Sequence, residues 1–98
     1  MTRDLIIATS RALTVADLSA AMAAVHQGRP WTVTDIGDRW RISHCDQLLM
    51  EAAPSVPMPD GAGWQTRFEV APEQDLGLGT EIVRAAAWQA GGDGTVGA

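Results

Sequence analysis

Residues 31–44 constrain the fold of this chain more than any other segment. They read WTVTDIGDRWRISH, so apolar and polar residues alternate on both sides of Gly37-Asp38. A period of two is typical of strands with one buried face, and a glycine in first position suits a two-residue II′ hairpin turn. We therefore predict a β-hairpin in which Val33 lies opposite Ile42 and Trp31 lies opposite His44. The predicted apolar face holds Trp31, Val33, Trp40 and Ile42, and the polar face holds Thr32, Thr34, Arg39, Arg41 and Ser43.

The same stretch permits a second interpretation. Residues 34–50 resemble the turn pattern of helix-turn-helix DNA-binding domains, in which His44–Met50 would be the recognition helix. Arg41 stands where that pattern usually has glycine, and Gln47 stands where it usually has an apolar residue. The β-branched flanks also favour strands. The hairpin is therefore preferred, and the DNA-binding regulator is kept as an alternative.

Three other segments carry clear patterns. The nearly continuous apolar run over residues 4–9 predicts an interior strand that is covered on both faces. Thr14 and Asp17 have the spacing of a capping box and precede an apolar stripe, so a helix is predicted that ends at Gly28. Alternation over residues 64–70 predicts a strand with one buried face.

The remaining segments are assigned from caps and turn residues. Asp46 is predicted to cap a short helix over residues 47–52, and Thr80 to cap a last helix that ends at Ala90. Proline and glycine indicate loops over residues 53–63 and 72–79.

Together these elements predict a single α+β domain. A chain of 98 residues, 46% of them apolar, is enough for one hydrophobic core. The order strand, helix, two strands, short helix, strand, helix predicts a two-layer sandwich of about four mostly antiparallel strands, with the two main helices on one face. We expect the domain to span residues 1–90 and residues 91–98 to form a flexible tail.

The net charge of −5 comes entirely from the second half of the chain. Residues 1–50 hold five arginines and five acids, whereas residues 51–98 hold two arginines and seven acids. Four of these acids lie around Pro72 and two glycines: Glu69, Glu73, Asp75 and Glu81. Such a cluster keeps a solvated loop soluble, and it also suits docking on a basic protein surface.

Reactive residue types are few. The only cysteine, Cys45, excludes an intramolecular disulfide, and it follows His44 directly. Adjacent residues on a strand point to opposite faces, so His44 is badly placed to activate Cys45 as a nucleophile. The chain has two histidines without metal-ligand spacing, and its Leu76–Gly79 segment lacks the lysine of a phosphate-binding loop. We expect no catalytic site, metal or cofactor.

The expected function is therefore that of a small acidic, non-catalytic protein-binding module. We expect it to inhibit a partner by covering a basic, nucleic-acid-binding or catalytic surface, by analogy of size and charge with immunity, anti-restriction and anti-CRISPR proteins. An acidic chain without lysine is a poor ligand for nucleic acid itself. Trp88 at a helix edge and Met58 between prolines are the expected apolar anchors. The predicted partner-binding residues are Glu69, Glu73, Asp75, Glu81, Trp88 and Met58.

Two further expectations accompany this one. No apolar run approaches the length needed to span a bilayer, and the stretch after Met1 is too short for a signal peptide, so we expect a cytoplasmic protein without a membrane partner. A small α+β enzyme or ligand-binding dimer that uses the sheet face as a pocket is the third functional class considered. A second copy of the chain, in a homodimer, is the other partner considered.

Overall fold

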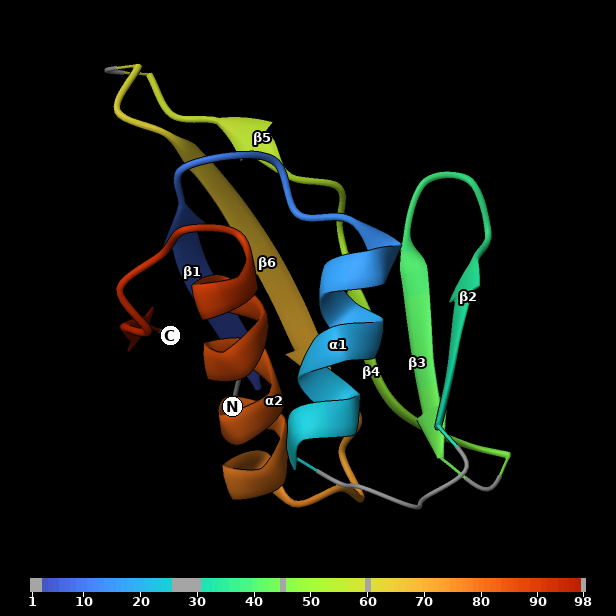
Figure 1. Cartoon of the computed structure of the whole chain (residues 1–98). Helices are drawn as coiled ribbons and strands as arrows, with labels where there is room; N and C mark the ends of the chain where they lie inside the picture. Colours follow the sequence, from blue (N-terminus) through green and yellow to red (C-terminus); the bar gives the residue numbers. More distant parts are fainter. Residues whose placement is uncertain (1–2, 26–30, 45, 60, 98) are drawn as a thin grey trace.

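The computed structural model describes residues 3–25, 31–44, 46–59 and 61–97. The chain forms a small α+β domain in which a mostly antiparallel sheet of seven strands carries two helices on one face (Figure 1). The elements along the chain are β1 (Asp4–Thr9), α1 (Val15–Val25), β2 (Trp31–Asp35), β3 (Trp40–His44), β4 (Gln47–Ala52), β5 (Val56–Pro57), β6 (Trp64–Val70), α2 (Leu76–Gln89) and β7 (Val96–Gly97).

The strands lie in the order β2-β3-β4-β6-β1-β7, and β5 pairs with β6. Strand β1, the first in the chain, therefore lies between β6 and the short C-terminal strand. In every strand pair of the sheet the two strands run antiparallel. Helices α1 and α2 pack against each other and leave the other side of the sheet uncovered (Figure 1). We call that uncovered side the open face.

The predicted hairpin is confirmed in its register. Val33 pairs with Ile42 and Trp31 pairs with His44. The backbone N–H of Ile36 donates to the carbonyl of Arg39 at 3.0 Å, and Gly37 has a φ of +102°, a value that L side chains rarely adopt. The helix-turn-helix alternative over residues 34–50 is wrong, because the described residues of this range, 34–44 and 46–50, form strands and turns.

The short helix predicted over residues 47–52 is also wrong. These residues form β4, which pairs with β3 on one side and β6 on the other. Ile42 pairs with Met50 and Ser43 with Leu48, so Leu49 is the extra residue of a β-bulge and is buried. Asp46, the expected helix cap, instead has a φ of +63° before β4, a conformation that aspartate tolerates better than most residues.

Both main helices are present, and one begins earlier than predicted. Helix α1 starts directly after Thr14, as expected. Helix α2 starts at Leu76, and its N-cap is Asp75, whose side chain accepts a hydrogen bond from the Gly77 N–H at 2.9 Å. Thr80 is not the cap: its hydroxyl donates to the carbonyl of Leu76 inside the helix.

The core lies between the helices and one face of the sheet. It includes Leu18 of α1, Ile82 of α2 and Phe68 of β6, all of them fully buried. On β1 only alternate residues are buried, so the expectation that both faces of this strand are covered is wrong. The reason is that both helices pack on the same side, which leaves Ile6 and Ala8 on the open face.

The C-terminal residues return to the sheet. Val96 pairs with Ile7 on β1, within the segment expected to be a flexible tail. Two residues of α2 contact Gly94. The Arg84 Nε donates to the Gly94 carbonyl at 3.3 Å, and the Trp88 ring lies close against the Gly94 backbone. A Cβ at position 94 would stand 2.5 Å from the Trp88 Nε1, so a side chain there would displace the indole.

Candidate functional site

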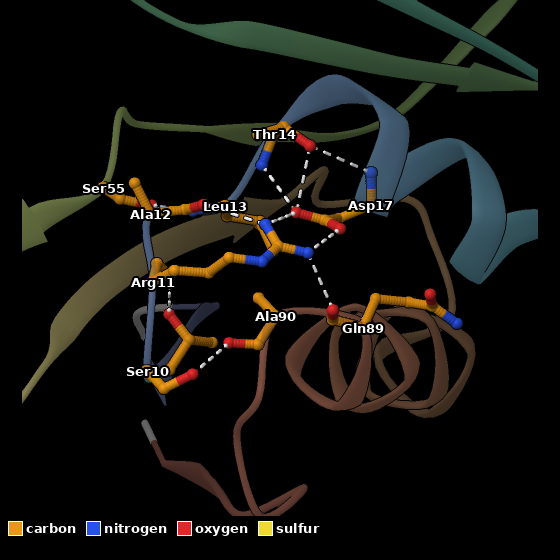
Figure 2. A network of polar contacts seen from close by, with 10 residues as sticks. Ser10, Arg11, Ala12, Leu13, Thr14, Asp17, Ser55, Gln89 and Ala90 are labelled. Atoms are coloured by element: carbon orange, nitrogen blue, oxygen red, sulfur yellow. Dashed lines mark hydrogen bonds and ion pairs between the residues drawn. The ribbon is translucent and has the colours of Figure 1, made fainter.

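Two polar corners lie at opposite ends of α2. The first, the paired corner, is built by Arg11, Thr14, Asp17 and Gln89 (Figure 2). Arg11 donates from both terminal nitrogens to the two carboxylate oxygens of Asp17, at 2.8 and 2.7 Å. The same guanidinium donates at 2.8 Å to the carbonyl of Gln89, the last residue of α2. One arginine thus joins the start of α1 to the end of α2.

The paired corner also contains the capping box of α1. The Asp17 carboxylate accepts from the Thr14 N–H at 2.9 Å, and the Thr14 hydroxyl accepts from the Asp17 N–H at 3.3 Å. The hydrogen bonds from Arg11 hold the pKa of the Asp17 carboxyl below its ordinary value; burial opposes this shift, and the Thr14 N–H supports it. The charged groups of the paired corner therefore bind one another and the backbone of the same chain. We call this set of contacts a joint, because it connects α1 to α2.

Neighbouring hydroxyl groups extend this joint. The Ser10 hydroxyl donates to the Ala90 carbonyl at 3.1 Å. Ser55 accepts from the Leu13 N–H at 2.9 Å and lies 2.7 Å from the hydroxyl of buried Thr66. These contacts tie the β1–α1 connection to α2, β5 and β6. The groups satisfy one another, which makes this region structural.

The second region, the acidic corner, is built by Glu69, Glu73 and Asp75 where β6 leads into α2. All three residues are exposed. Among the residues that the structure describes, none of the three forms an ion pair. One carboxylate oxygen of Asp75 accepts the capping hydrogen bond from the Gly77 N–H. The acidic corner thus presents three carboxylates without an ion pair in the described fold, and the one cation within the corner, Arg3, donates to the Gln74 carbonyl instead.

A hollow of about 370 Å³ opens beside the acidic corner. The start of β4 forms one wall and the β6–α2 connection forms the other. Leu48 is 36% exposed here, and Leu76 nearby is 41% exposed. The hollow therefore combines apolar wall surface with one acidic residue, Glu73. Its lining residues are Gln47, Leu48, Ala71, Pro72, Glu73 and Gln74.

On the open face, Glu69 lies in a row of three carboxylates. It pairs with Asp4 on β1 and with Glu51 on β4. Each of these neighbours has arginine partners: Arg67 contacts Asp4, and Glu51 binds Arg41 at 3.0 Å and Arg39 at 3.4 Å. Glu69 is the member of the row without one, in the described part of the chain.

The structure separates the six predicted partner-binding residues into three places. Glu69, Glu73 and Asp75 share the acidic corner. Glu81 and Trp88 lie on α2, where both line a different hollow against α1. Met58 follows β5 and is partly buried; its N–H donates to the carbonyl of Gly63 at 2.9 Å. Sequence reasoning missed Leu48 and Leu76, because Leu48 was placed in a helix and Leu76 in a loop.

The reactive cluster suggested by the sequence is only partly visible. Cys45 lies outside the described residues. The ring of His44 stacks on Trp31, with centroids 4.5 Å apart and planes inclined by 32°. Within the described ranges, the His, Cys, Asp and Glu side chains form no group of three or more that could hold a metal ion. Nor does any helix described there have the length and apolar character to cross a membrane.

Comparison with known proteins gives no family to which the chain can be assigned. No family model, no curated protein and no solved structure matches it.

Proposed function

We propose that this chain is a small, non-catalytic protein-binding module that docks its acidic corner on a basic surface of a partner protein and inhibits the partner by covering that surface. The observation that carries the proposal is the uncompensated charge. Residues 69–81 contain four acids and no arginine or histidine. The acids of the acidic corner have no ion-pair partner among the described residues.

The hollow supplies the shape that such docking needs. A lysine or arginine of the partner carries an apolar stem and a charged head. Its stem would pack against Leu48 and Pro72, while its head would meet the carboxylate of Glu73 at the rim. Leu76 does not line the hollow, but it is exposed two residues after Gln74, which does, and it offers the partner a further apolar contact. The site combines an apolar anchor with charge recognition, as protein interfaces commonly do.

The open face adds an electrostatic reason for binding a cation. Like charges that lie directly opposite each other on neighbouring strands destabilise a sheet. The carboxylates on either side of Glu69 are paired with Arg39, Arg41 and Arg67, so Glu69 is the member of the row left to accept a guanidinium or ammonium group from a partner. The excess of acids in residues 69–81 would attract a basic protein from a distance and speed association.

The test compares the wild-type chain with a matched variant, Glu73→Arg. Both are used to capture proteins from a lysate of the native host, and the association rate of each captured protein is then measured from low to high salt. We expect a partner that wild type retains and the variant loses. Its association should slow as salt rises, because charges on the two surfaces are screened beyond ~8 Å at physiological ionic strength. Its activity should fall in proportion to the bound chain.

The control is Asp93→Arg, the same change of charge on an exposed residue beyond α2. It should retain the partner. A captured partner that binds both variants equally, or whose association rate does not change with salt, would contradict the acidic corner as the docking surface. Partner activity that is unchanged at full occupancy would contradict inhibition.

A further inference from the structure

The solvent side of α2 carries a stripe that is complementary to itself. Gly77, Glu81, Arg84 and Trp88 follow one another at spacings of four, three and four residues, and all four are exposed. This spacing places them on one side of a helix, as in the contact seam of a coiled coil. Trp88 is 61% exposed, the highest value among the large apolar side chains of the described residues.

The stripe becomes complementary when a second copy is turned around. In an antiparallel pair of α2 helices centred between residues 82 and 83, Glu81 of one copy lies opposite Arg84 of the other. Trp88 then lies opposite Gly77. An acid therefore meets a base, and the largest side chain meets the smallest. A two-fold axis applies both matches twice.

From this match we propose that the chain forms a two-fold symmetric homodimer through the α2 stripe. The dimer goes beyond the proposed function, because it uses the solvent side of the helix layer rather than the acidic corner. In an antiparallel pair the two acidic corners would lie towards opposite ends of the joined helices. A dimer would therefore offer two docking surfaces that face away from each other.

The surroundings of the stripe allow close approach. A hollow of about 440 Å³ lies between α1 and α2, with Ala24, Val25 and Trp88 among its lining residues. The exposed residues of α1 are small and uncharged, so a neighbouring helix meets neither bulk nor charge there. These residues are Ala16, Ser19, Ala20, Ala23 and Ala24.

The contacts of Arg84 and Trp88 within one copy are compatible with the dimer. Arg84 uses its Nε on the Gly94 carbonyl, and its terminal nitrogens form no bond with the described residues. Those nitrogens are therefore available to Glu81 of the second copy. The indole of Trp88 lies against Gly94 and still exposes more than half of its surface. Gly94 thus holds the indole in place, which reduces the entropy lost on association.

The experiment is sedimentation equilibrium of the full chain over a range of concentrations. Wild type should show a monomer–dimer equilibrium. Glu81→Arg alone, and Arg84→Glu alone, should each weaken the dimer by about tenfold or more, because like charges then meet twice. The double variant carrying both changes restores opposite charges, so it should dimerise more tightly than either single variant. Trp88→Ala should weaken the dimer without changing its charge.

Glu69→Arg is the control, because it reverses one charge on the open face of the sheet and should leave the dimer unchanged. Circular dichroism of every variant establishes that loss of the dimer is not loss of the fold. A wild-type chain that stays monomeric at millimolar concentration would overturn the proposal. So would a double variant that dimerises no more tightly than the tighter of the two single variants, or a control that weakens the dimer as much as Glu81→Arg does.

Discussion

The two ends of α2 handle charge in opposite ways. At the C-terminal end, Arg11 donates to the Gln89 carbonyl; at the N-terminal end, Asp75 accepts from the Gly77 N–H. Both signs agree with the helix dipole, which favours cations at the C-terminus and anions at the N-terminus. The difference lies in compensation. Arg11 forms an ion pair with Asp17, whereas the acids about 20 Å away at the other end form no ion pair with the described residues.

The comparison teaches that charge of either sign can stabilise a helix end, while only uncompensated charge is left to act on another molecule. The charged groups of the paired corner form hydrogen bonds and an ion pair within the fold. In the acidic corner only one carboxylate oxygen, that of Asp75, accepts such a bond, and Glu69 and Glu73 are exposed without an ion pair in the described residues. Mutations at the paired corner should therefore change stability, and mutations at the acidic corner should change association.

The largest expected effect is at the paired corner. Asp17→Ala removes the bidentate ion pair with Arg11 and the carboxylate of the capping box. Hydrogen bonds to charged groups contribute about 2 kcal/mol, so we expect the free energy of unfolding to fall by about this amount. Urea denaturation at pH 7 measures it. A loss below about 0.5 kcal/mol, the scale of an ordinary surface substitution, would mean that the corner does not join the helices.

The pH dependence of stability tests the same group without truncating it. The pKa of Asp17 is lowered in the folded state, mainly by the Arg11 hydrogen bonds. Its contribution is therefore fully present above the unfolded pKa, 3.8, and is lost as the pH falls through the folded value. We expect the stability difference between wild type and Asp17→Asn to shrink as the pH is lowered below about 4. Urea midpoints from pH 7 to pH 2 measure it, and a constant difference would contradict the assignment.

A smaller effect is expected at the N-terminal end of α2. Asp75→Ala removes the cap and the bond to Gly77, which should lower the free energy of unfolding by about 1 kcal/mol. Asp75→Ser keeps a capping oxygen and removes the charge, so it should recover most of this loss. Thermal unfolding of both variants measures the effect. Equal destabilisation by alanine and serine would show that charge, rather than the capping bond, holds the helix end.

Local pattern was sufficient for the elements with an unambiguous period. The alternation on both sides of Gly37 predicted the hairpin and its register, and Thr14 with Asp17 predicted where α1 begins. Strand β6 was predicted with its bounds, because Trp64 to Val70 alternates without interruption. In each case local preference and tertiary packing agree.

Where local preference and packing disagree, the sequence misled. Residues 47–52 are mostly good helix formers, yet pairing with β3 and β6 makes them a strand, since tertiary context overrides propensity. Because Gly77 and Gly79 are typical of loops, residues 76–79 were predicted as a loop, whereas they form the first turn of α2. A Cβ at Gly79 would stand 3.0 Å from a methyl group of Val70, so the glycine lets the helix lie close to the sheet. That reason is visible only in three dimensions.

The site was predictable in its charge and not in its geometry. Composition alone located the acids of the acidic corner. It could not show that Leu48, distant in sequence, lies across the hollow from Glu73, because that contact depends on the strand order. Arg11 was missed because nothing in its sequence spacing connects it to Gln89. Long-range polar contacts of this kind leave no periodic signal.

The smallest expected effect on stability belongs to Glu73→Gln, and it is the sharpest test of the comparison. Glu73 is exposed and has no ion-pair partner among the described residues, so the free energy of unfolding should change by no more than about 0.5 kcal/mol. Its side chain keeps nearly the same shape, and only the charge is lost. Binding to a basic partner should nevertheless weaken. Calorimetry measures the binding affinity, and urea denaturation measures the free energy of unfolding. If the substitution lowered stability as much as Asp17→Ala does, the acidic corner would be a structural joint like the paired corner, and the contrast between the two ends of α2 would disappear.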